Sequence, residues 1–209
     1  MKKNALFILA IAVLSISGCN IAQQIKEIQN FAKCEFRLAT LQNTNLGGLN
    51  MQNKKSVSDF SFSDGLKLKS LAGKDSWPLS FTLNVEAKNP NSSQAAMNKF
   101  EWILFMDDNQ LVEGILGDRI EIAPNAGVTT IPLQINIDLK KVLSGKSFDS
   151  MLNLVFNITG EGNKPTRFLL KAKPTIMIGS YPLTYPGYID IKQEFTASMG
   201  KEIRNQVVK

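Results

Sequence analysis

Histidine is absent from this chain of 209 residues, and cysteine occurs only twice. Without histidine, neither the Ser-His-Asp nor the Cys-His arrangement of nucleophilic catalysis can be built, and catalytic zinc loses its usual imidazole ligands. Two cysteines without histidine are also too few for a zinc site. We therefore expect a protein that is not an enzyme and that needs neither a metal ion nor a cofactor.

Long runs of like charge are also absent. The 24 basic and 18 acidic residues give a formal net charge of +6, and no five consecutive residues carry the same sign. Because nucleic-acid binding requires a clustered basic stripe, we expect no nucleic-acid partner. The hydrophobic fraction of 44% and the chain length are those of a globular domain with its own core.

The N-terminal residues have the layout of an export signal. Two lysines follow Met1, and an almost unbroken apolar run covers residues 5–16. This run is too short to cross a bilayer as a helix, but it has the length of the apolar region of a signal peptide. It leads into Ile-Ser-Gly-Cys at residues 16–19, where small residues directly precede a cysteine. This order resembles the bacterial lipobox. The alternative is an uncleaved signal anchor with a chance cysteine.

The lipobox resemblance implies that Cys19 becomes the first residue of the mature protein. A diacylglycerol is attached to its sulfur, a signal peptidase cuts between Gly18 and Cys19, and the new amino group takes an acyl chain such as palmitate. Two or three chains anchor a protein stably, whereas one would be marginal. Loss of the signal peptide, residues 1–18, would leave 22 basic residues against 18 acidic ones, a net charge of +4.

The residues after Cys19 bear on where the anchor is delivered. Asn20 stands where an Asp would mark retention in the inner membrane, and the acidic cluster that marks surface export in Bacteroidetes is missing. By this resemblance we expect an outer membrane lipoprotein that faces the periplasm. Its partners would be the membrane and an unidentified envelope protein or lipid.

Residues 19–33 are expected to form the lipidated tether. Ile21, Ile25, Ile28 and Ala32 recur at helical spacing and predict a short amphipathic helix. Two interpretations of this apolar stripe stay open: it lies on the lipid interface beside the anchor, or it packs on the domain.

Cys34 is the second cysteine, and acylation of Cys19 would leave it without a partner in its own chain. We interpret it as a small buried residue at the start of a strand. The alternative is a bridge to another chain.

Residues 34–209 are expected to form one domain made mainly of strands. Residues 79–87 and 130–139 alternate strictly between apolar and polar side chains, which is typical of strands with one buried face. Residues 100–106 are apolar on both faces, which predicts a central strand with Trp102 in or near the core. An acidic turn then leads to residues 111–116 and predicts a hairpin. Further strands are predicted at residues 34–41, 118–123, 166–173 and 187–195.

Two segments predict short helices. Residues 63–73 would be capped by Ser63 or Asp64 and ended by Gly73, and residues 147–156 would begin after Ser147. The tyrosines and prolines of residues 181–188 predict a packed turn. Many short strands with frequent turns favour a β-sandwich or barrel.

Three blocks of sequence, in this order, resemble the LEA14-like family, also called group 2 late-embryogenesis-abundant or WHy domains. The first is a strand that ends in Asn89-Pro90-Asn91, the second is the hairpin of residues 100–114, and the third is a Pro-led turn followed by the strand of residues 130–139. The resemblance covers about sixty residues and is strongest to the lipoproteins of Bacteroidetes. It implies a mainly β fold, namely an Ig- or fibronectin-III-like β-sandwich, and no catalytic residues.

From the residues themselves, Asn89, Pro90 and Asn91 are interpreted as a structural turn. Pro90 must end the strand because it cannot donate to the ladder, and both asparagines tolerate turn geometry.

The expected function is a non-enzymatic, membrane-anchored envelope lipoprotein with an LEA14-like binding or structural domain. The family resemblance links it to stress. The alternative is a periplasmic carrier of lipid or another hydrophobic ligand.

Overall fold

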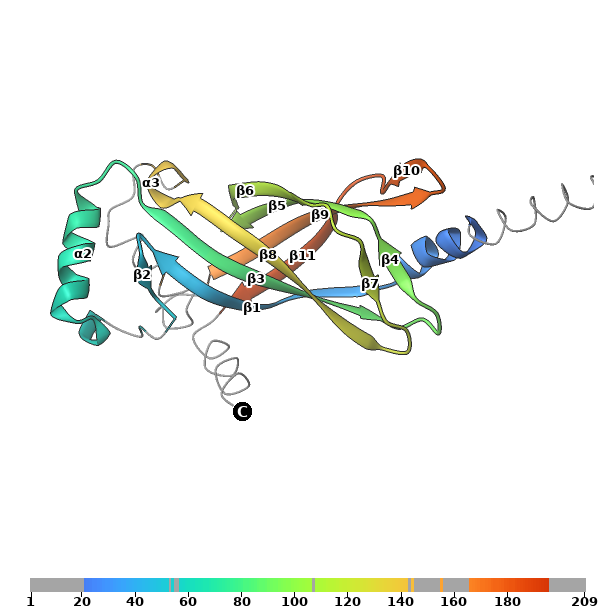
Figure 1. Cartoon of the computed structure of the whole chain (residues 1–209), viewed down its shortest axis with the longest axis horizontal. Helices are drawn as coiled ribbons and strands as arrows, with labels where there is room; N and C mark the ends of the chain where they lie inside the picture. The colour runs from blue at the N-terminus through green and yellow to red at the C-terminus, as the bar shows by residue number, and fades with distance from the viewer. Residues whose placement is uncertain are drawn as a thin grey trace, which may run out of the picture.

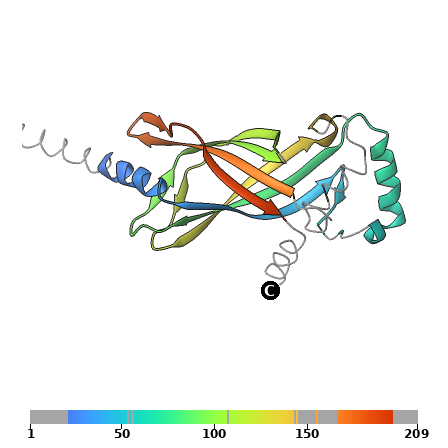
Figure 2. The same ribbon diagram turned by 180° about the vertical axis from the view of Figure 1, so that it is seen from behind.

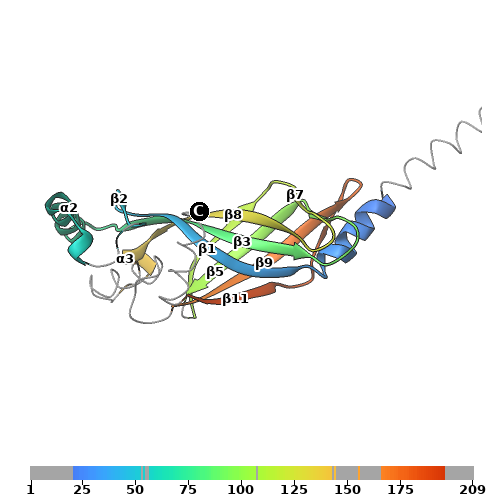
Figure 3. The same ribbon diagram turned by 90° about the horizontal axis from the view of Figure 1, so that it is seen from below.

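Two antiparallel sheets face each other across an apolar core (Figures 1 and 3). The computed structural model describes residues 21–52, 54, 57–106, 108–142, 144, 155 and 166–195. The first sheet has the strand order β2 (Leu49–Asn50), β1 (Glu35–Leu46), β3 (Pro78–Asn89) and β8 (Gly127–Asp138). The second has the order β10 (Tyr181–Thr184), β9 (Thr166–Ile178), β5 (Lys99–Met106) and β6 (Asn109–Leu116), and β11 (Ile189–Phe195) also pairs with β9.

The remaining elements lie at the two ends of this sandwich (Figures 1 and 2). A helix over residues 21–31 and the short pair β4 (Ala95–Met97) and β7 (Ile120–Ile122) lie at one end. The 3-10 helix η1 (Val57–Asp59), α2 (Phe62–Ala72) and α3 (Leu139–Val142) lie at the other. These elements confirm the mainly β class and the β-sandwich with short helices.

Alternating side chains explain why β3 and β8 pair as they do. The pairing joins Leu79 to Ile137 and continues in register to Val85 and Ile131, so that apolar residues stand opposite one another on the inner face. A shift of one residue would turn this whole set toward solvent. All the residues predicted to point inward are at most 8% exposed: Leu79, Phe81, Leu83, Val85, Ala87, Ile131, Leu133, Ile135, Ile137 and Leu139.

Strand β5 lies between β6 and β9, as a central strand should. Trp102 is 6% exposed and points inward, and its neighbour across the strand pair is Gly114 of β6. A Cβ atom at Gly114 would lie 2.3 Å from the Trp102 ring, so the indole occupies the space that any other side chain would need. The glycine of the predicted hairpin is therefore a packing requirement of the core.

The start of α2 differs from its prediction by two residues. Ser61, not Ser63 or Asp64, is the N-cap, and Asp64 lies at the third helical position. The two residues form a capping box: the Asp64 carboxylate accepts from the Ser61 backbone, and the Ser61 hydroxyl accepts from the Asp64 backbone. The helix ends at Gly73 as predicted. The helix predicted at residues 147–156 lies outside the described residues except for Val155, which is buried.

Gly114→Ala is expected to lower the free energy of unfolding by about 1–3 kcal/mol, because the new methyl group collides with the buried Trp102 ring. Gly117→Ala is the matched control, since nothing lies within 4 Å of its added Cβ. Urea unfolding curves of the two variants check the prediction. Equal midpoints would contradict this account of the β5–β6 packing.

Candidate functional site: the docked N-terminal helix

The helix over residues 21–31 is part of the folded domain. Its domain-facing side combines an apolar residue, Phe31, with two polar ones, Glu27 and Asn30, and all three are at most 7% exposed. Ile28 packs against the core cluster as well. Residues spaced by three and four lie on one face of a helix, so this side runs from Gln24 through Glu27 and Ile28 to Phe31.

The last turn of this helix is held by the loop before β4. The Asn30 amide donates to the Ser93 hydroxyl at 2.8 Å, to the Ser93 carbonyl at 3.2 Å and to the Gln94 carbonyl at 2.9 Å. In return, the Asn91 amide donates to the Asn30 carbonyl at 3.0 Å. The Asn30 carbonyl also accepts from the Lys33 backbone at 3.1 Å, and Asn91 adds a contact from the sandwich to this last turn.

Asn89 holds Asn91 in position for this contact. Its side chain is fully buried, with 0% exposure, and its amide donates to the Ser93 carbonyl at 3.0 Å and to the Ile122 carbonyl at 3.1 Å. Its oxygen accepts from the Asn91 backbone at 3.0 Å and from the Asn91 side chain at 2.7 Å. A buried amide that lost such partners would cost about 1–3 kcal/mol. Asn89, Pro90 and Asn91 thus lie in the turn that receives the helix.

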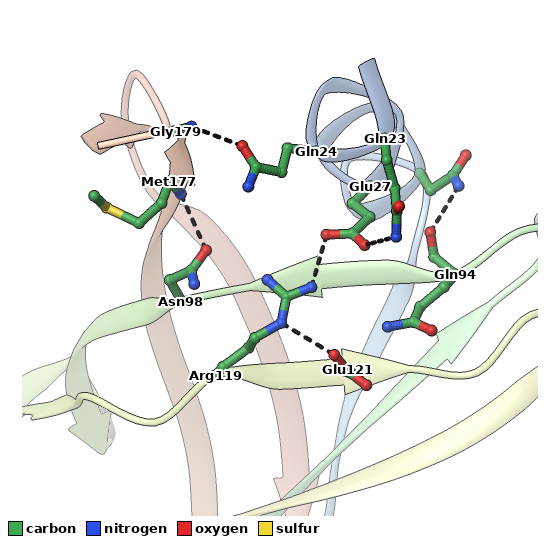
Figure 4. A network of polar contacts seen from close by, with 10 residues as sticks. Gln23, Gln24, Glu27, Gln94, Asn98, Arg119, Glu121, Met177 and Gly179 are labelled. Carbon is green, nitrogen blue, oxygen red and sulfur yellow. Dashed lines mark hydrogen bonds and ion pairs between the residues drawn. The ribbon is translucent and has the colours of Figure 1, made fainter. Parts of the chain in front are cut away.

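An ion pair holds the middle of the helix. Arg119, just before β7, donates to Glu27 at 2.8 Å and to Glu121 at 3.0 Å (Figure 4). The hydrogen bond to Glu27 is the main cause that raises the pKa of the Arg119 guanidinium above its usual value. The Glu27 side chain is only 7% exposed, and the Gln23 amide donates to its other carboxylate oxygen at 3.2 Å, so both oxygens have a partner.

A third contact joins the helix to the β9–β10 hairpin. The Gln24 side chain accepts from the Gly179 backbone at 2.7 Å, at the turn between the two strands (Figure 4). Asn98 accepts from the Met177 backbone at 3.0 Å and steadies the end of β9. The packed turn predicted for residues 181–188 is wrong, because Tyr181, Tyr185 and Tyr188 are 41–81% exposed.

Only part of the apolar stripe predicted for the helix packs on the domain. Ile28 packs on the domain, but Ile21 and Ile25 are each 41% exposed and Ala32 is exposed. The docking side is offset from the stripe because polar residues, above all Glu27 and Asn30, find partners in the loops of the sandwich. Spacing of apolar residues could not show this, since those partners lie more than 60 residues away.

Cys34 lies where the helix passes into β1. Its thiol is half-buried, free, and 3.4 Å from the Asn30 carbonyl, to which it donates. Burial raises the pKa of Cys34 from about 9 to about 11. This environment is that of a packing residue rather than of a reactive thiol.

The candidate lipidation site lies outside the described residues, which begin two positions after Cys19 and three after Gly18. Within the described ranges, no group of three or more acidic or cysteine side chains is placed to bind a metal ion. No helix in the same part of the chain is long and apolar enough to span a bilayer.

The described residues line one small apolar pocket between the sheets. An apolar pocket lined by residues such as Phe31, Phe36 and Phe100 has a volume of about 10 Å³, room for one water molecule. Two larger hollows of about 410 and 480 Å³ are open to solvent and carry charged residues, Arg167 and Lys192 in one and Glu101 and Glu113 in the other.

No family model matches the sequence, and no curated protein matches it. Among solved structures, the chain is similar to a protein of Archaeoglobus fulgidus, with 19% identity over 59% of this chain and 87% of that one and a TM-score of 0.34. A protein of Arabidopsis thaliana shows 14% identity over 60% and 73%, with a TM-score of 0.35. A late embryogenesis abundant (LEA) protein shows 12% identity over 94% and 91%, with a TM-score of 0.32.

Asn91→Ala is expected to loosen the helix, because it removes a partner of the Asn30 carbonyl and of the buried Asn89 oxygen. Amides of residues 24–33 should exchange with deuterium about tenfold faster, as expected for a loss of about 1–2 kcal/mol. Asn136→Ala on the exposed face of β8 is the matched control. If exchange in residues 24–33 were the same in both variants, the asparagine network would not be what holds the helix.

Alkylation of Cys34 should be slow and strongly pH-dependent. With its pKa raised from about 9 to about 11, the thiolate population at pH 8 falls by about 100-fold relative to a free thiol. The rate at which iodoacetamide alkylates Cys34 is measured by mass spectrometry between pH 8 and 11. In the folded protein this rate should still be rising at pH 10. The urea-unfolded chain is the control: its rate should be half-maximal near pH 9 and should level off near pH 10. Identical profiles for both would contradict burial of this thiol.

Proposed function

We propose that this protein is a non-enzymatic envelope lipoprotein whose docked N-terminal helix holds a β-sandwich at a fixed place on the membrane. The observation that carries the proposal is the junction between anchor and domain. The lipobox ends at Cys19, and two residues later Ile21 already lies in a helix that is hydrogen-bonded into the domain.

This junction limits the distance between the anchor and the domain. Two residues span at most about 7 Å in any conformation, so Ile21 would lie directly at the bilayer surface. The contacts of Asn30, Glu27 and Gln24 then join the helix to three different parts of the sandwich, namely the loop before β4, the start of β7 and the β9–β10 turn. A lipid on Cys19 would therefore fix both the distance and the tilt of the domain.

A fixed tilt favours presentation of a surface to another envelope component. The end that carries α2 would point away from the membrane, because it lies opposite the helix over residues 21–31 (Figure 1). We propose that the sandwich meets its partner at that end or along its sides. We further propose that the protein is located in the outer membrane and faces the periplasm.

Carriage of a hydrophobic ligand is less well supported. Sites for small ligands usually enclose about 300–1,000 Å³, whereas the one apolar pocket that the described residues line between the sheets measures about 10 Å³. The larger hollows are open and lined in part by charged residues, which would be left without water under an acyl chain.

Lipid on Cys19 is the testable core of the proposal. In cells fed a labelled fatty acid, wild-type protein and Cys34→Ser should incorporate the label, and Cys19→Ser should incorporate none. The intact mass of the wild type should correspond to a chain that begins at Cys19 and carries acyl groups. Membrane fractionation alone would not decide, because the apolar run of residues 5–16 could hold an uncleaved precursor on the membrane. Unlabelled wild type, or label retained by Cys19→Ser, would overturn the proposal.

A further inference from the structure

Exposed apolar side chains gather at the end of the sandwich that carries the helix. Ten large hydrophobic side chains of the described residues are exposed, and six of these belong to the helix or to the segment from β10 to β11. Only two, on α2, lie at the opposite end. The six are Ile21, Ile25, Tyr181, Leu183, Tyr185 and Tyr188.

The β9–β10 hairpin presents an apolar face that no second layer of the described residues covers. Tyr181 pairs with Ile178 and Leu183 with Ile176, so these four side chains share one face. Ile176 is 9% exposed and belongs to the core, whereas Leu183 is 48% exposed and Tyr181 is 81% exposed. The inner face of the sheet therefore continues past the end of the core and out into solvent.

The helix adds a second exposed apolar strip beside the hairpin. At about 100° per residue, Ile21 and Ile25 lie about 60° and 100° around the helix from Gln24, on the side away from Glu27 and Asn30. Both isoleucines are therefore turned away from the contacts with Arg119 and β4. Their 41% exposure is a consequence of how the helix is docked.

One hydrogen bond keeps the two apolar strips together. The Gln24 side chain accepts from the Gly179 backbone at 2.7 Å, which fixes the hairpin turn beside the first turns of the helix (Figure 4). Figures 1 and 2 both show the hairpin and the helix extending from the same end of the sandwich. Ile21, the first described residue of the helix, lies at this end too, so a lipid on Cys19, two residues before it, would lie on the same side as the exposed apolar residues.

We propose that Ile21, Ile25, Tyr181 and Leu183 form a membrane-contact surface that enters the headgroup region of the bilayer in which the lipid on Cys19 is embedded. The inference rests on the proposed function, since that anchor places the bilayer at this end. Tyrosine prefers the interface because its ring is apolar and its hydroxyl stays hydrated. Lys26 is exposed on the same helix and suits anionic headgroups.

The depth of Tyr181 in the bilayer tests this surface. Tyr181→Trp and Phe62→Trp place a new tryptophan at two sites of similar exposure, 81% and 85%, at opposite ends of the molecule. Each full-length lipidated variant is reconstituted in vesicles of phosphatidylethanolamine and phosphatidylglycerol with brominated acyl chains. The parent protein, in which Trp77 and Trp102 are each 6% exposed, supplies the background emission.

Tyr181→Trp should lose about half of its added emission to the brominated lipids and should shift to the blue, because a side chain at this depth lies near the acyl chains. Phe62→Trp should keep the emission of a hydrated indole. Quenching of neither variant, or of both alike, would overturn the membrane-contact surface. A blue shift that grows with protein concentration in the absence of vesicles would overturn it in favour of a second copy of the chain.

The two proposals fail in distinguishable ways. An acylated intact mass together with an unquenched Tyr181→Trp would overturn the membrane-contact surface and leave the lipid anchor standing. A mass without acyl groups would overturn the anchor. In that case, the unlipidated chain would be mixed with the vesicles and the quenching of Tyr181→Trp measured again. This measurement would decide whether the membrane-contact surface binds lipid without the anchor.

Discussion

The asparagine network at the base of the N-terminal helix is the constraint on which the arrangement of this protein depends. Asn91 donates to the Asn30 carbonyl, and the fully buried Asn89 holds Asn91. The Asn89 side chain has lost contact with water, so its polar atoms require these partners. With the network intact, the helix is an element of the sandwich. Without it, the same residues would be a tether of the kind that the sequence predicts.

This constraint determines how a lipid on Cys19 would orient the domain. A lipid at the end of a loose tether would leave the domain free to rotate above the membrane. A lipid two residues before a docked helix would instead fix one end of the sandwich at the bilayer. The hydrophobic residues exposed at that end are then explained by their position, because the bilayer is the apolar phase nearest to them.

The sequence predicts most of the sandwich, since its strands follow simple alternation. The inward residues of β3 and β8 are all buried, and Trp102 lies inside the central strand. The docking of the helix could not be predicted in this way, because it depends on Glu27 and Asn30, polar residues that pair with distant loops. The hairpin strand β10 was also missed, since all four of its side chains are exposed and it has no buried face to reveal it.

The most direct test of the docked helix is a distance between the helix and the sandwich in the lipidated protein. Spin labels on Gln29→Cys and Val128→Cys, both at exposed positions, would be attached in a Cys34→Ser background, with the sulfur of Cys19 already blocked by its lipid. Electron–electron double resonance should give one narrow distance distribution, the same in detergent and in vesicles. A broad distribution, or one that changes between the two, would show that the helix is a loose tether and would contradict the account.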